Sequence, residues 1–160
     1  MQDKPNVVYI LADDMGYGDI SAFNEFCPFE TPNLDALCRE GMAFCDAHAT
    51  SAVCTPSRYG ILTGRYNWRS ALKEGVMSGY DRALIEPDRL TVAHMFRDNG
   101  YATAAIGKWH LGMDLSVTEE FELAADYEQC PGVDYAGVIR NGPTAYGFDS
   151  FYGIAGSLDM

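Results

Sequence analysis

The sequence has few positive charges, no long apolar run and no closely spaced pair of cysteines. The 160-residue chain has only 11 Lys and Arg residues and 23 Asp and Glu residues, so its formal net charge is −12. A field of that sign repels phosphate groups, which argues against a nucleic acid or an anionic membrane as a partner. The longest apolar run near the N-terminus covers only residues 7–12. A membrane-spanning helix needs about 20 apolar residues, so none is expected.

The cysteines are also placed in a way that excludes a common kind of site. The chain has five of them, which cannot all pair with one another, and none forms a C-x-x-C pair. A zinc knuckle is therefore not expected. Four are expected to be buried thiols that act as small apolar side chains: Cys27, Cys38, Cys45 and Cys130. Cys54 has a different context, described below.

What is present is a regular alternation of apolar runs and helix signals. Strands are predicted at residues 6–12, 42–49 and 101–106. Helices are predicted at three places: after the Thr31–Pro32 cap up to Gly41, at residues 55–63 before Gly64, and after Thr91 up to Asn99. Strands that alternate with helices indicate an α/β fold with a mostly parallel sheet flanked by helices.

Two features of the sequence indicate that the domain is incomplete and contains an insertion. Three strands are fewer than an open parallel sheet usually has, so the chain is predicted to be the N-terminal part of a larger domain. Acidic residues mixed with isolated apolar ones make residues 114–141 a predicted exposed insertion.

The pair Asp13–Asp14 follows the first predicted strand directly. The carboxyl ends of parallel strands form the edge where α/β sheets bind ligands. Both carboxylates converge only if the chain turns at once, and Met15–Gly16 is the expected turn. Two adjacent carboxylates repel each other unless a cation lies between them, and their oxygens suit Ca²⁺ or Mg²⁺. The alternative is a turn whose two acids simply face water.

The segment Cys54-Thr55-Pro56-Ser57-Arg58 opens a predicted helix. The positive field at a helix N-terminus favours anions and activates nucleophiles, and Arg58 follows Cys54 by about one helical turn. The alternative is a buried cysteine before an ordinary capped helix.

Lys108 and His110 follow the third predicted strand within the segment G-K-W-H-L-G. They share one face if the extended conformation persists, which would place a cation beside a group that exchanges protons near neutral pH. Together the three segments predict a site for an oxyanion, in which a carboxylate-held cation, Arg58, Lys108 and His110 reverse the negative charge locally.

These residues stand in motifs that resemble the sulfatase family. C-T-P-S-R followed by L-T-G at residues 54–64 is similar to the sulfatase signature. Further segments also resemble the family: N-V-V-Y-I-L-A-D-D-M-G-Y-G-D near the N-terminus, T-P-N-L-D at 31–35, G-K-W-H-L-G at 107–112 and Y-G-F-D-S-F-Y-G at 146–153. The joint occurrence of several motifs is far more specific than any one of them.

The resemblance implies an alkaline-phosphatase-like fold and the hydrolysis of a sulfate ester, with a carbohydrate sulfate as the expected substrate. It implies that a formylglycine-generating enzyme converts Cys54 into formylglycine, whose hydrate is the nucleophile. Asp13, Asp14 and the oxygen derived from Cys54 would bind Ca²⁺, and Arg58 would steady that oxygen. Lys108 would hold the sulfate and His110 would remove a proton.

The resemblance also implies parts that cannot be assigned within the chain. The family has further metal ligands, another Lys and a leaving-group acid, which are expected beyond Met160. The 160 residues alone are therefore expected to be inactive and to bind Ca²⁺ weakly. Export is expected for the family, although no signal peptide is seen in this chain. The alternatives are a phosphonate or phosphodiester hydrolase of the same superfamily, or a non-catalytic metal-binding fragment in which Cys54 remains a thiol.

Overall fold

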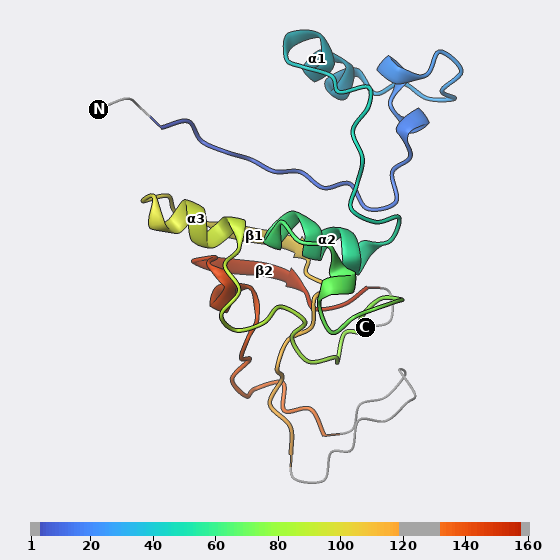
Figure 1. The fold of residues 1–160 in the computed structure, drawn as a ribbon. Coiled ribbons are helices and arrows are strands. Elements are labelled where there is room, and N and C mark those ends of the chain that lie inside the picture. The colour runs from blue at the N-terminus through green and yellow to red at the C-terminus, as the bar shows by residue number, and fades with distance from the viewer. Residues whose placement is uncertain (1–3, 119–131, 158–160) are drawn as a thin grey trace. The chain divides into compact units, whose positions relative to one another are not determined.

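The computed structural model describes residues 4–118 and 132–157 and divides into two compact units (Figure 1). The first unit is Met1–His48 and the second is Ala49–Met160. Their positions relative to each other are not determined, so each unit is described by itself. None of the described helices is long and apolar enough to cross a membrane.

The first unit consists of two short 3₁₀ turns and one helix, held by a polar hub. The turns are η1 (Tyr17–Asp19) and η2 (Ser21–Phe23), and the helix is α1 (Pro32–Glu40). Pro32 is the first residue of α1, as the sequence predicts. The Asp35 carboxylate accepts hydrogen bonds from the Ser21 hydroxyl at 2.7 Å and from the Thr31 hydroxyl at 2.8 Å. These hydroxyl donors lower the pKa of Asp35, that of Ser21 having the largest effect.

Two of the predicted strands are absent from the first unit. Residues 6–12 and 42–48 have no strand assignment, so the strand predictions at 6–12 and 42–49 are wrong for the described structure. A strand is defined by backbone pairing, and the first unit has no described strand to pair with either segment. Val8 is 81% exposed and Ile10 84% exposed, because nothing within their own unit covers them.

The helices of the second unit agree with the sequence. They are α2 (Cys54–Thr63) and α3 (Val92–Asp98), with the 3₁₀ turns η3 (Asn67–Arg69) and η4 (Pro143–Tyr146). The helix α2 ends at Gly64, which takes the left-handed conformation with φ of 63°. Thr91 caps α3 by accepting a hydrogen bond from the His94 backbone N–H.

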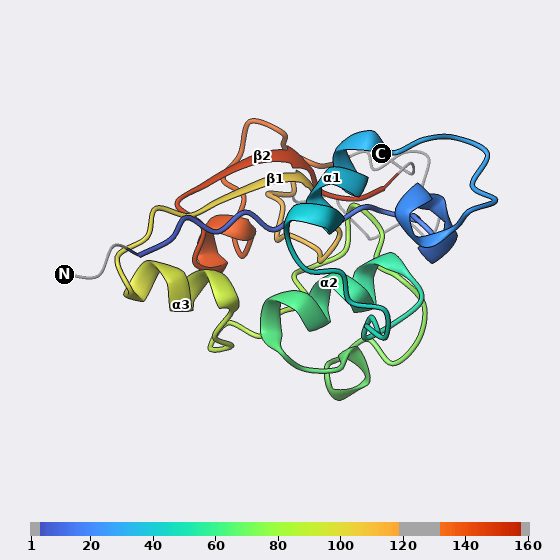
Figure 2. The ribbon, with the colours of Figure 1, turned by 90° about the horizontal axis from the view of Figure 1, so that it is seen from above.

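A two-stranded parallel sheet lies beside these helices. It pairs β1 (Ala104–Lys108) with β2 (Ser150–Ile154), and Ile106 stands opposite Tyr152. Figures 1 and 2 show β1 and β2 side by side, with α2 and α3 along one side of them. The strand predicted at 101–106 is therefore present, but its bounds are shifted toward the C-terminus. The segment that forms β2 was identified in the sequence only as a family motif and not as a strand. The parallel strands flanked by helices confirm an incomplete α/β domain.

The apolar core lies around the segment that follows β1. Trp109 is 4% exposed and its ring stacks near that of Tyr146, with centroids 6.2 Å apart. The rest of the cluster is Tyr59, Leu84, Ile85, Leu111 and Met113. Tyr146 donates a hydrogen bond from its hydroxyl to the Ile85 carbonyl at 2.5 Å. Burial is the main reason that the pKa of Tyr146 rises to about 12.

The predicted insertion at 114–141 is described only at its two flanks. Isolated antiparallel bridges join Asp114 to Arg140 and Val117 to Val133. Val117 is 52% exposed and Val138 71% exposed. Residues 119–131 lie outside the described residues, so the exposed insertion stays a prediction.

Candidate active site

The centre of the candidate site is the N-terminal turn of α2. Val53, in extended conformation, precedes the helix, and Cys54 is its first residue, half-buried and present as a free cysteine. Ser57 fixes this turn because its hydroxyl contacts the carbonyls of Ser51 at 2.9 Å and Val53 at 2.7 Å. The sequence predicted a helix that begins just after Cys54, whereas Cys54 is the first residue of the helix in the structure. The thiol still lies where backbone N–H groups point outward and favour an anion.

Arg58 connects this helix to the end of β1. One turn after Cys54, its Nη1 donates a hydrogen bond to the carbonyl oxygen of Lys108. The contact joins segments that are 50 residues apart in the sequence. The predicted thiol–arginine segment and the predicted Lys/His segment therefore belong to one packed assembly within the second unit.

The extended conformation that would place Lys108 and His110 on one face does not persist to His110. β1 ends at Lys108, and His110 has a φ of 54°, in the left-handed region. Side chains two residues apart share a face only in extended backbone, so that argument does not apply here. The Lys108 Nζ donates to the Ser157 hydroxyl at 3.0 Å, whereas the imidazole Nε2 of His110 contacts the Met77 carbonyl at 2.6 Å.

Backbone bonds to β2 hold this loop in place. The backbone N–H of Trp109 donates a hydrogen bond to the carbonyl of Ile154 at 2.9 Å. The backbone N–H of His110 donates to the carbonyl of Ala155 at 2.8 Å. Gly112 has a φ of 69°, and a Cβ there would overlap the backbone carbonyl of Arg82. The loop after β1 is thus fitted closely between β2 and the segment near residue 82, and only glycine is tolerated at position 112.

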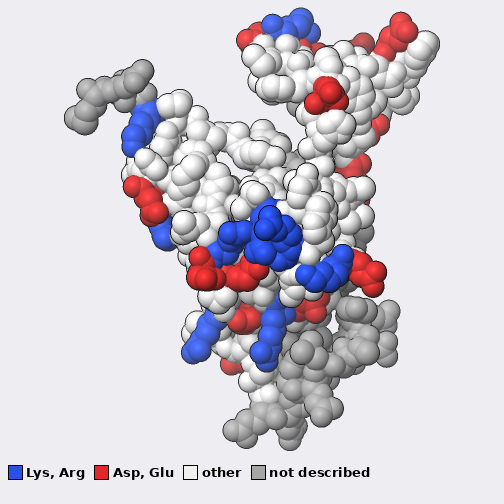
Figure 3. Space-filling model, viewed as in Figure 1, with Lys and Arg blue, Asp and Glu red and all other residues white. Residues whose placement is uncertain are grey.

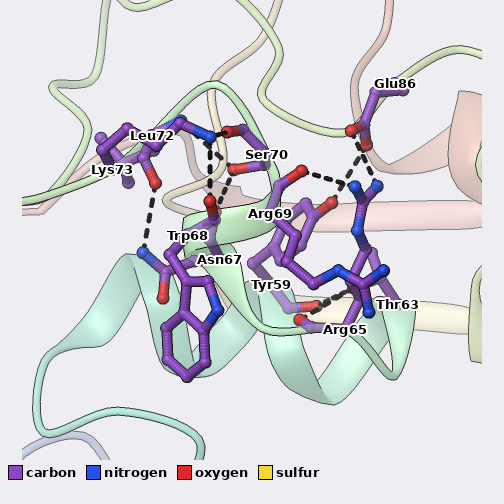
Figure 4. A network of polar contacts seen from close by, with 10 residues as sticks. All are labelled: Tyr59, Thr63, Arg65, Asn67, Trp68, Arg69, Ser70, Leu72, Lys73 and Glu86. Atoms are coloured by element: carbon purple, nitrogen blue, oxygen red, sulfur yellow. Dashed lines mark hydrogen bonds and ion pairs between the residues drawn. The ribbon is translucent and has the colours of Figure 1, made fainter.

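The far end of α2 is fixed by a second set of polar contacts (Figure 4). Glu86 accepts a hydrogen bond from the Tyr59 hydroxyl at 3.0 Å and pairs with Arg65 at 3.2 Å. Arg65 also donates to the Arg69 carbonyl at 2.5 Å. Burial, followed by the contact with Glu86, raises the pKa of Tyr59. These contacts hold the helix that carries Cys54 from its opposite end.

Positive charge gathers locally in spite of the acidic composition. In the space-filling view, Lys and Arg side chains cluster over the part of the second unit where α2 lies, with acidic side chains beside them (Figure 3). Arg65 and Arg69 follow directly after α2. These cations lie beyond the end of α2 that is opposite to Cys54, and Arg65 is paired with Glu86, so they do not supply the charge at the candidate nucleophile.

Asp13 and Asp14 belong to the first unit and form a turn there. Asp14 has a φ of 62°, which Asp tolerates better than most residues do. The turn is therefore at the two acids themselves, rather than at Met15–Gly16 as the sequence indicated. Both side chains are exposed. Because the two units are not placed relative to each other, the meeting of these carboxylates with Cys54 stays a prediction.

No full metal site is formed within the part of the chain that the structure describes. Residues 4–118 and 132–157 contain no group of three or more His, Cys, Asp or Glu side chains that could hold an ion. The donor chemistry nevertheless fits Ca²⁺, because adjacent exposed carboxylates supply hard oxygen ligands. Asp13 and Asp14 alone would supply only part of a coordination shell, so the Ca²⁺ site stays a prediction.

Three residues that the sequence did not indicate contact the predicted ones. Ser157 contacts Lys108, Met77 contacts His110, and Thr55 donates a hydrogen bond to the His110 carbonyl at 3.0 Å. Neither Met77 nor Ser157 stands near the others in the sequence, so only the tertiary structure could reveal them. Thr55 lies inside the C-T-P-S-R segment, but nothing in its sequence position indicates the contact.

Comparison with known proteins identifies the family. The family model "Sulfatase" matches residues 5–160. N-acetylgalactosamine-6-O-sulfatase of Bacteroides thetaiotaomicron is 38% identical over 156 residues, covering 98% of this chain and 27% of that protein. Mouse arylsulfatase G is 38% identical over 160 residues, covering 98% of this chain and 25% of that protein. The chain thus spans about a quarter of the length of these relatives.

Solved structures agree with this result. A structure whose title describes the metabolism of multiple glycosaminoglycans by Bacteroides thetaiotaomicron superposes with a TM-score of 0.80 at 37% identity. It covers 97% of this chain, which corresponds to 29% of that chain. The structure titled Ps i-CgsB in complex with k-i-k-neocarrahexaose has a TM-score of 0.73 at 30% identity, with the same coverage. From the motifs, the α/β fold and these matches we conclude that the chain belongs to the sulfatase family.

Proposed function

We propose that this chain forms the N-terminal, nucleophile-bearing part of a sulfuric ester hydrolase that releases inorganic sulfate from a sulfated carbohydrate. The observation that carries the proposal is the contact between Arg58 and the Lys108 carbonyl. It joins the helix that Cys54 opens to the segment with Lys108 and His110, so a nucleophile position, a cation and an imidazole belong to one packed region. One relative is named N-acetylgalactosamine-6-O-sulfatase, which supports the substrate class.

Each side chain has a chemical task in this proposal. Asp13, Asp14 and an oxygen derived from Cys54 would hold Ca²⁺. If present, a formylglycine hydrate at position 54 would supply the attacking oxygen, and Ca²⁺ would supply positive charge beside that oxygen and the sulfate. Arg58 keeps the helix turn that bears position 54 against the end of β1.

Lys108 and His110 are the remaining side chains of the proposal that lie within this chain. The ammonium group of Lys108 binds the sulfate oxygens, and its contact with Ser157 at 3.0 Å holds it at the end of β1. His110 is only 2% exposed and accepts a proton during turnover. A monoanionic sulfate needs such a local excess of positive charge in an acidic protein.

The test is sulfate release by the protein expressed from its complete reading frame, with and without a formylglycine-generating enzyme. Peptide mass spectrometry across position 54 measures the conversion of the thiol into an aldehyde. We expect turnover of an aryl sulfate and of 6-sulfated N-acetylgalactosamine only when that conversion has occurred. Cys54→Ala should reduce the rate by more than about a thousandfold, because the nucleophile is lost.

Cys45→Ala is the matched control. Cys45 is exposed, so its predicted burial is wrong, and it lies outside the motif and should tolerate the change. An aryl phosphodiester tested in parallel distinguishes the phosphodiesterase alternative, and its faster hydrolysis would overturn the sulfatase assignment. Turnover by a protein whose Cys54 remains a thiol would contradict the proposed chemistry. We also propose that residues 1–160 expressed alone are inactive, so robust turnover by them would contradict an incomplete site.

A further inference from the structure

Three hydrogen bonds form a closed ring among Thr55, Met77 and His110, each of which comes from a different segment of the second unit. The Thr55 hydroxyl donates to the His110 carbonyl at 3.0 Å. The same hydroxyl oxygen accepts from the Met77 backbone N–H at 3.1 Å. The Met77 carbonyl in turn meets the imidazole Nε2 of His110 at 2.6 Å. Thr55 therefore contacts both the backbone of His110 and the residue that binds its ring.

The ring of bonds decides which imidazole nitrogen carries the proton. A carbonyl oxygen can only accept, so Nε2 of His110 must be the donor in its bond to Met77. In the neutral imidazole the other nitrogen, Nδ1, then holds the lone pair. The atom of His110 that can accept a proton is therefore Nδ1.

Burial and backbone conformation make the position of His110 dependent on these contacts. Thr55 is fully buried and His110 is 2% exposed, so water does not replace a lost partner easily. His110 has a φ of 54°, a conformation that a residue with a Cβ keeps only where its surroundings impose it. The hydrogen bond from Thr55 to the His110 carbonyl and the bond from the His110 N–H to Ala155 hold that conformation from both sides.

We propose that Thr55 is a positioning residue for His110, acting through the His110 carbonyl and through Met77 to fix the imidazole as the Nε2–H tautomer. Nδ1 is then the atom that takes up the proton in the reaction. The role of that proton transfer rests on the proposed function, but the tautomer and the position of the ring do not.

The experiment compares two substitutions of Thr55 in the protein expressed from its complete reading frame. Thr55→Val keeps the shape of the side chain but removes the hydroxyl, and Thr55→Ser keeps the hydroxyl. Rates are expressed per modified site, measured by mass spectrometry across Cys54, because Thr55 is the next residue to the modified one. We expect Thr55→Val to lower kcat by about 10- to 100-fold with KM changed less than about twofold. Thr55→Ser should stay within about threefold of the wild-type kcat.

A second measurement reads the tautomer directly. Long-range ¹H–¹⁵N spectra of protein labelled at histidine show which ring nitrogen is protonated, and His110→Gln identifies the signal of His110. We expect a protonated Nε2 and an unprotonated Nδ1 in the wild type and in Thr55→Ser. Thr55→Val should show mixed tautomers.

The outcomes separate this inference from the proposed function. Equal kcat values for Thr55→Val and Thr55→Ser would overturn the role of Thr55, and a wild-type His110 protonated at Nδ1 would overturn the tautomer. The wild-type spectrum needs no Thr55 variant, so it decides the tautomer of His110 even if Thr55→Val does not fold. A wild type that carries formylglycine and releases no sulfate would instead contradict the proposed function and leave the spectrum to judge the tautomer.

Discussion

The two units of the chain are stabilised in different ways. Within the described part of the first unit, residues 4–48, no residue is buried, and a carboxylate surrounded by hydroxyl donors ties α1 to the turn before it. The second unit instead has an apolar core that is built around Trp109 and Tyr146. Apolar burial is the larger source of stability in a folded domain, whereas an exposed polar hub adds little to it. The candidate residues are divided between the two units, with the carboxylates in the first and the remaining ones in the second.

The largest expected effect comes from removing a large side chain of the core. Trp109→Ala should lower the free energy of unfolding of the second unit by about 3–5 kcal/mol, because it leaves a cavity beside Tyr146. Urea unfolding followed by near-ultraviolet circular dichroism measures it. Phe26→Ala is the control in the first unit and should cost about 0.5 kcal/mol or less, because Phe26 is 82% exposed. A comparable loss of unfolding free energy at both positions would show that the two units are not stabilised in different ways.

The second unit is expected to lose stability in alkali. The unfolded pKa of a tyrosine is about 10. The pKa of Tyr146 in the folded state is raised to about 12. Between these values the unfolded chain releases a proton that the folded chain keeps. Stability from this group is therefore complete below pH 10 and falls as the pH rises toward 12, by about 2–3 kcal/mol in total.

Urea titrations between pH 8 and 12 test this slope. Tyr146→Phe is the matched control, since it keeps the ring and removes the hydroxyl that ionises. The variant should be less stable at pH 8, because the Ile85 carbonyl loses its donor. Its stability should also depend less on pH above 10, and a slope equal to that of the wild type would show that Tyr146 is not the source.

The smallest expected effect is an acid-labile first unit. The pKa of Asp35 is lowered, chiefly by the Ser21 hydroxyl, from an unfolded value of about 3.9. Its contribution is therefore present above that value and is lost as the pH falls through the folded pKa. The protection factors of the α1 amides, which correct for the intrinsic pH dependence of exchange, should be lower at pH 3 than at pH 5.

Asp35→Asn should remove most of that pH dependence, whereas Glu40→Gln, at the end of the same helix, should retain it. Amide exchange in the second unit should stay unchanged in both variants. Equal acid sensitivity in wild type and Asp35→Asn would show that the hub does not hold the first unit.

Local sequence signals predicted the helices better than the strands. The helices α1, α2 and α3 begin and end within a residue or two of the predicted positions, because Thr31, Pro32, Gly64 and Thr91 act on their immediate neighbours. The strand predictions at 6–12 and 42–49 were wrong for the described structure because an apolar run becomes a strand only beside a partner. The pairing of β1 with β2 joins residues 46 positions apart, which no local pattern contains.

The sequence by itself determined the family and the helix at Cys54, and it predicted the kind of chemistry that its motifs carry, because these depend on residue type and short spacing. Only the tertiary structure decided that Arg58 binds the end of β1, that His110 turns away from the extended path, and that Thr55 and Met77 hold it. Those contacts join residues 33 to 55 positions apart. They form only when the core around Trp109 has brought distant segments together.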